Sequence, residues 1–159
     1  MKKFLSVMAF LALLSLSQGC AMQGENPEQA IAAVKALDAR YTAAFSKGDL
    51  DGVMAEYWKS PELVVYPPDA PEGKGWDNVK AGFGNFMKNA PGAKLEITEA
   101  TYTLKGDSVL AWGRWKMSFP AVKDGPVMMG RFTEVAMKKE GKWVLVHDHP
   151  SLPMQPPAK

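Results

Sequence analysis

Lys142-Trp-Val-Leu-Val-His-Asp-His149 is an apolar run that becomes polar at its end, and it contains both histidines of the chain, His147 and His149. Side chains alternate between the two faces of a strand, so both imidazole rings are expected on the face of Leu145, with Asp148 on the other. An apolar strand with a polar end is typical of a pocket mouth. A strand that emerges into solvent gives the same pattern.

The preceding run, 127–138, is expected to pair with this strand through a hairpin. Lys139-Glu-Gly141 fits a three-residue loop with glycine in the left-handed conformation. Counting back from this loop pairs Thr133 with His147 and Arg131 with His149, all on one face. The four side chains would then form one polar group, and a slip of one residue would move Arg131 to the opposite face.

An amphipathic helix is expected earlier in the chain, because Asn26 is a good N-cap, Pro27 suits the first helical position and Gly48 ends the pattern. Its buried stripe comprises Ile31, Val34, Leu37, Tyr41, Ala44 and Phe45. A short second helix follows Asp49, and a third carries Trp76, Val79, Phe83 and Phe86.

Strands account for most of the remaining chain. A short strand is predicted at 62–66, a loop at 69–75, and four longer strands at 94–104, 109–119, 127–138 and 142–149. Three helices followed by a four-stranded meander predict an α+β fold, with helices on one face of a curved antiparallel sheet.

The amino terminus has the layout of a secretory signal. Lys2 and Lys3 precede the apolar run 4–16, and small or polar residues follow, so residues 1–20 are excluded from the fold. The run is too short to span a bilayer comfortably. Removal leaves about 139 residues, which is one domain.

The only cysteine, Cys20, lies at the exit of this segment. Leu16-Ser-Gln-Gly-Cys20 resembles a bacterial lipobox, although Ser17 stands where the usual leucine would be. This resemblance implies lipidation of Cys20, a tether at 21–25 and a periplasmic lipoprotein that reaches the membrane only through its lipid. Cleavage after Ala21 by an ordinary signal peptidase, or retention of the segment, are the alternatives.

Charge and residue counts exclude several classes of site. The net charge of +2 falls close to zero without the signal, so there is no electrostatic footprint for nucleic acid. Two histidines lack a third metal ligand, because Asp148 is expected on the other face, so no metal or other cofactor is predicted. A triad of Ser151 with His149 lacks a nucleophile elbow.

The element order and three motifs resemble the nuclear transport factor 2-like superfamily, in particular its SnoaL-like and calcium/calmodulin-dependent kinase II association-domain-like branch. The motifs are Tyr41-Thr-Ala-Ala-Phe-Ser-Lys-Gly-Asp-Leu50, Gly130-Arg-Phe-Thr-Glu-Val135 and Gly141-Lys-Trp-Val-Leu-Val-His-Asp-His-Pro-Ser151. The resemblance implies a cone-shaped domain at 26–153, with the sheet wrapped around the long helix and a mostly apolar cavity, followed by a tail at 154–159. It specifies function weakly, because the family includes isomerases, cyclases, dehydratases and oligomerisation modules.

Ketosteroid isomerase offers a closer comparison, because residues 40–52 are similar to its first helix. Tyr41 matches the tyrosine that donates to the oxyanion. Tyr66 occupies the position of the aspartate base, and Thr133 that of the second acid. Without a carboxylate base beside the donor, the resemblance implies no proton shuttle of that kind.

The expected function is therefore an exported small-molecule-binding domain with catalysis unassigned. Its ligand is expected to be a small carboxylate or polar aromatic molecule, and the expected ligand-binding residues are Tyr41, Tyr66, Trp115, Arg131 and Thr133. An isomerase or lyase with His147 or His149 as general acid/base remains an alternative, as does a non-catalytic dimerisation module.

A homodimer is also expected, by resemblance to the family and from the sheet face opposite the histidines. Phe132, Val144 and Val146 would leave apolar surface on that face.

Overall fold

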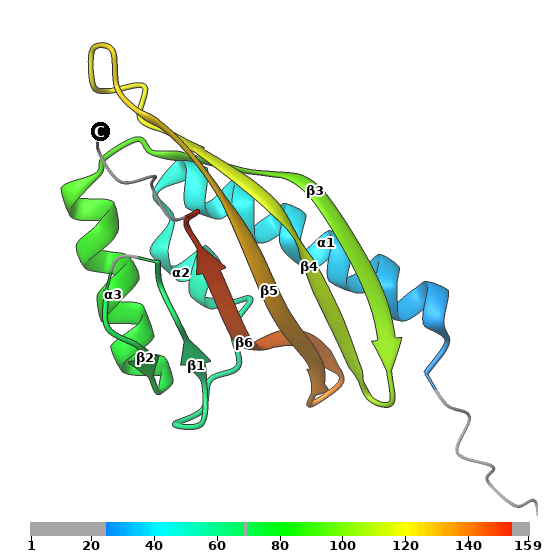
Figure 1. Cartoon of the computed structure of the whole chain (residues 1–159). Coiled ribbons are helices and arrows are strands. Elements are labelled where there is room, and N and C mark those ends of the chain that lie inside the picture. The colour runs from blue at the N-terminus through cyan, green and yellow to red at the C-terminus, as the bar shows by residue number, and fades with distance from the viewer. Residues whose placement is uncertain (1–24, 69, 154–159) are drawn as a thin grey trace, which may run out of the picture.

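The long helix 27–47 lies along one face of a curved sheet, and the helix 76–89 lies at the end of the sheet formed by its two shortest strands (Figure 1). The structure is a computed structural model that describes residues 25–68 and 70–153. Its elements are α1 (Pro27–Lys47), α2 (Leu50–Met54), β1 (Val64–Val65), β2 (Gly73–Lys74), α3 (Trp76–Asn89), β3 (Lys94–Lys105), β4 (Ser108–Ser118), β5 (Val127–Lys139) and β6 (Lys142–Ser151). The predicted α+β class is confirmed. The signal segment with Cys20, most of the tether and the tail fall outside the described residues.

Helix α1 begins and ends at the predicted caps. The Asn26 side chain accepts hydrogen bonds from the backbone N–H groups of Glu28 (2.9 Å) and Gln29 (3.2 Å). Gly48 ends the helix in the left-handed conformation, with φ 71°. The buried face of α1 also includes a carboxylate, Asp38, which is 4% exposed.

The sheet has the strand order β2-β1-β6-β5-β4-β3. Its antiparallel meander β3–β6 agrees with the prediction, but β1 pairs in parallel with β6, so the sheet is mixed. Strand β2 lies inside the predicted loop at 69–75 and pairs with β1. Strand β1 falls within the short strand predicted at 62–66, whereas β2, with two residues, is too short to show an alternating pattern and was not predicted.

The turn of the last hairpin is tighter than predicted. It has two residues, Glu140 and Gly141, whose φ angles of 51° and 80° are those of a type I′ turn. Lys139 therefore pairs with Lys142.

The register of β6 differs from the prediction because the strand contains a β-bulge. Val146 is an extra residue between two successive pairs, so His149 lies opposite Thr133 rather than Arg131, and Arg131 lies opposite Ser151. Arg131 and Thr133 thus each pair two positions further along β6 than predicted. Because a shift of two residues keeps the face of a strand, both still share a face with His149.

The bulge also reverses the alternation along β6. Leu145 and Asp148 are buried toward the helix side, whereas His147 and His149 point to the opposite, outer face. The expectation that both histidines share the face of Leu145 is therefore wrong, and Asp148 takes the inward position.

Two of the three side chains predicted for the apolar dimer surface are buried. Phe132 and Val144 are each 7% exposed, and Phe132 packs with Ala111 and Trp115, whereas Val146 is half-buried. The outer face instead exposes Trp112 and Met129. None of the helices in the described part of the chain is long and apolar enough to cross a membrane.

Candidate active site in the cone

A cavity of about 630 Å³ lies between α1, α3 and the inner face of the sheet. Its wall is largely aromatic and comprises Tyr41 and Phe45 from α1, Phe83 and Phe86 from α3, and Trp115 and Phe132 from the sheet. The charged groups on its wall are two acids, Glu134 and Asp148, and no Lys, Arg or His is among the described lining residues. Such apolar walls with a few convergent polar groups are typical of small-molecule sites.

Glu134 and Asp148 are direct cross-strand partners on β5 and β6. They are 4% and 6% exposed, and their side chains stand on the same inner face of the sheet. The bulge at Val146 is what brings Asp148 onto this face.

The segment after α2 supplies a hydrogen-bond donor to Asp148. Trp58 N–H donates to the Leu145 carbonyl (2.9 Å), which places Tyr57 against β6. Tyr57 Oη then donates to Asp148 Oδ2 at 2.7 Å. Burial raises the pKa of Asp148 to about 6, and the hydrogen bond from Tyr57 opposes that rise. Asp148 is therefore ionised at neutral pH but can take up a proton at little cost.

Asp38 and Glu134 form a second acidic group beneath the cavity. Tyr102 Oη donates to Asp38 Oδ2 at 2.6 Å. The other oxygen of Asp38 and Glu134 Oε1 are buried without a hydrogen-bond partner, and the two carboxyl groups lie within hydrogen-bonding reach of each other. Burial is the main cause that raises the pKa of both acids. The negative charge of Asp38 raises the pKa of Glu134 further, so Glu134 favours its protonated form more strongly than Asp38 does.

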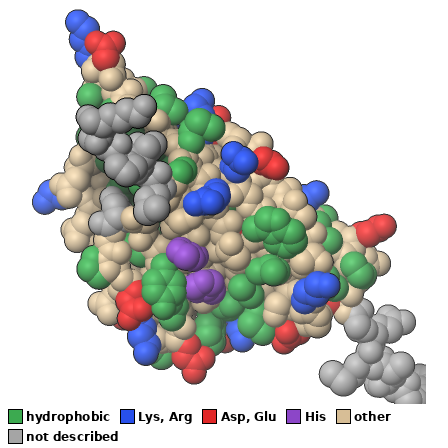
Figure 2. Space-filling view, in the orientation of Figure 1, with side chains coloured by type: hydrophobic (Ala, Val, Ile, Leu, Met, Phe, Trp, Pro, Cys, Tyr) green, Lys and Arg blue, Asp and Glu red, His purple; other side chains and the backbone are tan. Residues whose placement is uncertain are grey.

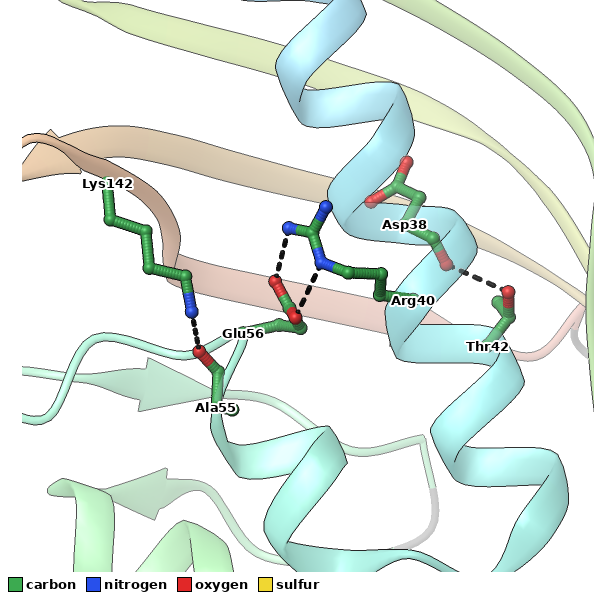
Figure 3. Close-up of polar contacts among 6 residues, drawn as sticks. All are labelled: Asp38, Arg40, Thr42, Ala55, Glu56 and Lys142. Carbon is green, nitrogen blue, oxygen red and sulfur yellow. Dashed lines mark hydrogen bonds and ion pairs between the residues drawn. The ribbon is translucent and has the colours of Figure 1, made fainter.

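Arg40, the arginine of α1, pairs with Glu56 rather than with these two acids. Arg40 Nε and Nη2 form a bidentate contact with Glu56 at 2.9 and 2.8 Å. Figure 3 shows this pair beside the Lys142 contact with the Ala55 carbonyl, and no contact joins Arg40 to the Asp38 carboxylate.

Tyr41 lies on the cavity wall, as the sequence predicts. Its ring packs edge-on against Tyr57 at 5.9 Å and against Phe83 at 6.4 Å. Burial, followed by the charge of Asp148, raises the pKa of Tyr41, so its hydroxyl stays protonated and able to donate. The inference that no carboxylate lies near this donor is wrong, because Asp148 and Glu134 occupy the same cavity.

Trp115 is the second predicted residue on the cavity wall. Its indole Nε1 donates to the Arg131 carbonyl at 3.0 Å, which fixes the ring across the neighbouring strand. The structure thus brings Tyr41 and Trp115 into one cavity.

The remaining predicted ligand-binding and catalytic residues lie on the outer face. The Tyr66 ring packs edge-on against both His147 and His149, with centroids 5.7 Å apart in each case. Figure 2 shows the two histidines side by side on the exposed surface. Arg131 and Thr133 line a separate shallow hollow of about 340 Å³ on that face, so any role for these five residues falls outside the cavity.

Sequence reasoning missed the acids, although two of them leave a detectable signal. Asp38 interrupts the apolar stripe of α1, and Glu134 stands between Phe132 and Ala136 in the inward positions of β5. A lone carboxylate in a buried apolar pattern is costly unless it has a task. Asp148 had no such signal, because its direction depends on the bulge. The described residues include no group of three or more His, Cys, Asp or Glu side chains suited to a metal ion.

The fold and cavity define a single-domain cone, with a curved sheet and three helices around an acidic, aromatic-walled cavity. The chain belongs to the SnoaL-like domain family, whose model matches residues 34–155, within the nuclear transport factor 2-like superfamily. No curated protein sequence matches it at a significant level.

Solved structures show the same fold. A protein from Streptomyces avermitilis, named as a dehydratase of the nuclear transport factor 2-like family, superposes with a TM-score of 0.73 at 15% identity, covering 80% of this chain and 99% of that one. A protein from Xanthomonas campestris, named for the calcium/calmodulin-dependent protein kinase II association domain, has a TM-score of 0.66 at 24% identity, covering 77% and 86%. A protein of unknown function from Shewanella oneidensis reaches 28% identity with a TM-score of 0.60, covering 76% and 98%.

Proposed function

We propose that the chain binds a small molecule with a largely apolar body in the cone cavity, with the polar end of the ligand against Glu134 and Asp148. The observation that carries this proposal is an aromatic-walled cavity of about 630 Å³ whose only charged lining groups, among the described residues, are those two acids. A carboxylate ligand, which the sequence favoured, would be repelled there. The predicted contact of Arg131 with a carboxylate stays a prediction for the outer hollow.

Acid/base catalysis of an isomerase or lyase type is the second candidate. It is favoured by the unequal acidity of two neighbouring groups, because the pKa of Asp148 is raised to about 6 while that of Glu134 is raised well above its usual range. Asp148 would accept a proton from the ligand, and Glu134 would donate one. The similarity to a fold relative named as a dehydratase agrees with this candidate.

A substitution at the cavity wall tests the binding site itself. Gly82 lines the cavity, and a Cβ at this position meets nothing within 4 Å, so Gly82→Phe would place a ring in the opening without a backbone clash. We expect Nile red, a neutral dye that fluoresces in apolar sites, to bind the wild-type protein and to bind Gly82→Phe about tenfold more weakly. The control is Ala81→Phe, at an exposed position of the same helix outside the cavity. Equal dye binding by both variants would contradict the cavity as the site.

Export and lipid attachment complete the proposal. The signal pattern before Cys20 supports a periplasmic protein anchored through a lipid on that cysteine. In a bacterial host, Cys20→Ala should abolish labelling by a palmitate analogue and release the protein from membranes. Membrane association that persists in this variant would indicate an uncleaved segment instead.

A homodimer through the outer face of the sheet is also proposed. Exposed Trp112 and Met129 support an interface there rather than at Phe132 and Val144, which are buried.

A further inference from the structure

Among the described residues that line the cavity, no Lys, Arg or His stands beside the acids to balance their charge. Asp38, Glu134 and Asp148 are three buried acids at this end of the cavity, and Asp148 is ionised at neutral pH. Tyr57 and Tyr102 donate hydrogen bonds to these acids but bring no positive charge. Buried charge without a counter-charge is unfavourable, so a ligand that supplies a positive charge would gain more here than in water.

The carboxyl group of Glu134 also lines this end of the cavity. Glu134 is 4% exposed and its Oε1 is fully buried, so a ligand would contact its other oxygen, Oε2. Asp148 lies directly opposite it on β6, with one oxygen engaged by Tyr57. A cationic head group placed between the two strands would therefore meet both carboxyl groups.

The aromatic wall favours the same charge. The faces of aromatic rings are electronegative and attract ammonium groups, most strongly where water is excluded. Phe83, Phe86 and Trp115 line the cavity, so its apolar surface and its acids attract the same kind of ligand. A metal ion is a poorer fit, because the described acids form no group suited to coordinate one.

We infer that the ligand of the cavity is an organic cation, an amine or ammonium compound with an apolar body, whose positive group contacts Glu134 and Asp148. This inference rests on the proposed function and specifies its ligand class. A neutral ligand would leave the acidic charge unbalanced, and an anionic ligand would add to it.

Three probes with one common body separate these possibilities, namely phenylpropylamine, phenylpropanol and phenylpropanoate. We expect calorimetric titration at about pH 7.5, where the amine is charged, to give at least about tenfold tighter binding of the amine than of the alcohol, and weaker binding still of the carboxylate. Gly82→Phe should weaken binding of the amine, which assigns it to the cavity.

The acids are tested by Asp148→Asn, which keeps an oxygen for Tyr57 but removes the charge. The preference for amine over alcohol should fall about tenfold, whereas the outer-face control Glu99→Gln should keep it. The wild-type preference should also fall when the pH is lowered to about 5, because Asp148 becomes protonated. This second measurement decides the case if Asp148→Asn does not fold.

The groups facing Asp148 are Glu134 from β5, Asp38 and Tyr41 from α1, and Tyr57 after α2. Helix α3 contributes no titratable side chain to the cavity.

The outcomes separate the inference from the proposed function. Alcohol binding that equals or exceeds amine binding, in a manner sensitive to Gly82→Phe, would overturn the cationic ligand and leave the cavity as a binding site. An amine preference that survives both Asp148→Asn and acidic pH would also overturn it. If Gly82→Phe affects neither Nile red nor any of the three probes, both the inference and the proposed function are wrong.

Discussion

Asp148 should make the stability of the fold depend on pH in an unusual direction. Its pKa is raised from 3.8 to about 6 in the folded state, so the folded protein holds this proton more tightly than the unfolded chain does. The contribution of Asp148 to stability is therefore largest below about pH 4, falls as the pH rises through the window between the two values, and is constant above it. The shift of about two units corresponds to about 3 kcal/mol.

Asp148→Asn isolates this effect, because asparagine is neutral at every pH and can still accept from Tyr57. Relative to the wild type, the free energy of unfolding of the variant should be larger by about 2 kcal/mol at pH 7 than at pH 4, where the unfolded wild-type chain is already partly ionised. Denaturant titrations at both pH values, followed by tryptophan fluorescence, measure this difference, and the other acids largely cancel in it. A difference that does not change with pH would show that Asp148 is not desolvated in the folded protein.

Individual residues differ in how well the sequence predicted them. Tyr41 and Trp115 were placed correctly, because a buried aromatic position follows from helical spacing or strand alternation alone. The histidines were placed on the wrong face, because alternation was counted through Val146 without the bulge. The single extra residue is therefore the reason that Asp148, and not His149, lies on the cavity wall.

At the scale of elements, the curved pair β4–β5 depends on one glycine. Gly130 lies opposite Trp115, and a Cβ at this position would overlap the indole ring and crowd the Ser151 carbonyl. The glycine therefore lets the ring lie flat across β5, where it forms part of the cavity wall.

Gly130→Ala should displace Trp115 and destabilise the protein by about 1–3 kcal/mol, the usual cost of overpacking. The indole N–H resonance of Trp115 should shift, because its hydrogen bond to the Arg131 carbonyl would be strained. Gly82→Ala is the matched control, since a methyl group there meets nothing within 4 Å and improves helix propensity. An unperturbed Trp115 resonance in Gly130→Ala would show that the ring is not held by this close approach.

The long elements, the short helix α2 and the short strand β1 were predicted, whereas β2 was not. The caps Asn26 and Gly48 fixed α1, and glycine-containing turns separated the four long strands correctly. Strand β2 has two residues and exists because β1, which itself pairs with β6, offers an edge to pair with. Pairing of that kind is a tertiary interaction that local patterns do not reveal.

At the scale of the whole molecule, the outer face of the sheet is suited to pair with a second copy of itself. Trp112 is 41% exposed and is flanked across the sheet by two small side chains, Thr101 and Thr133, so its indole stands out from the surface. Arg114 and Glu99 form an ion pair beside it at 3.2 Å. A surface that carries both signs of charge can match its own copy across a two-fold axis.

The wild-type protein should therefore sediment as a dimer at concentrations of about ten micromolar and above. Trp112→Glu should weaken association at least about tenfold, because it would bury a carboxylate at the centre of the interface without a partner. Val122→Glu, at a position 55% exposed in the β4–β5 loop and away from this face, is the matched control and should remain dimeric. Sedimentation velocity at several concentrations measures all three proteins. A wild-type monomer at the highest concentration would rule out the interface, and a dimer that both variants leave intact would assign it to another surface.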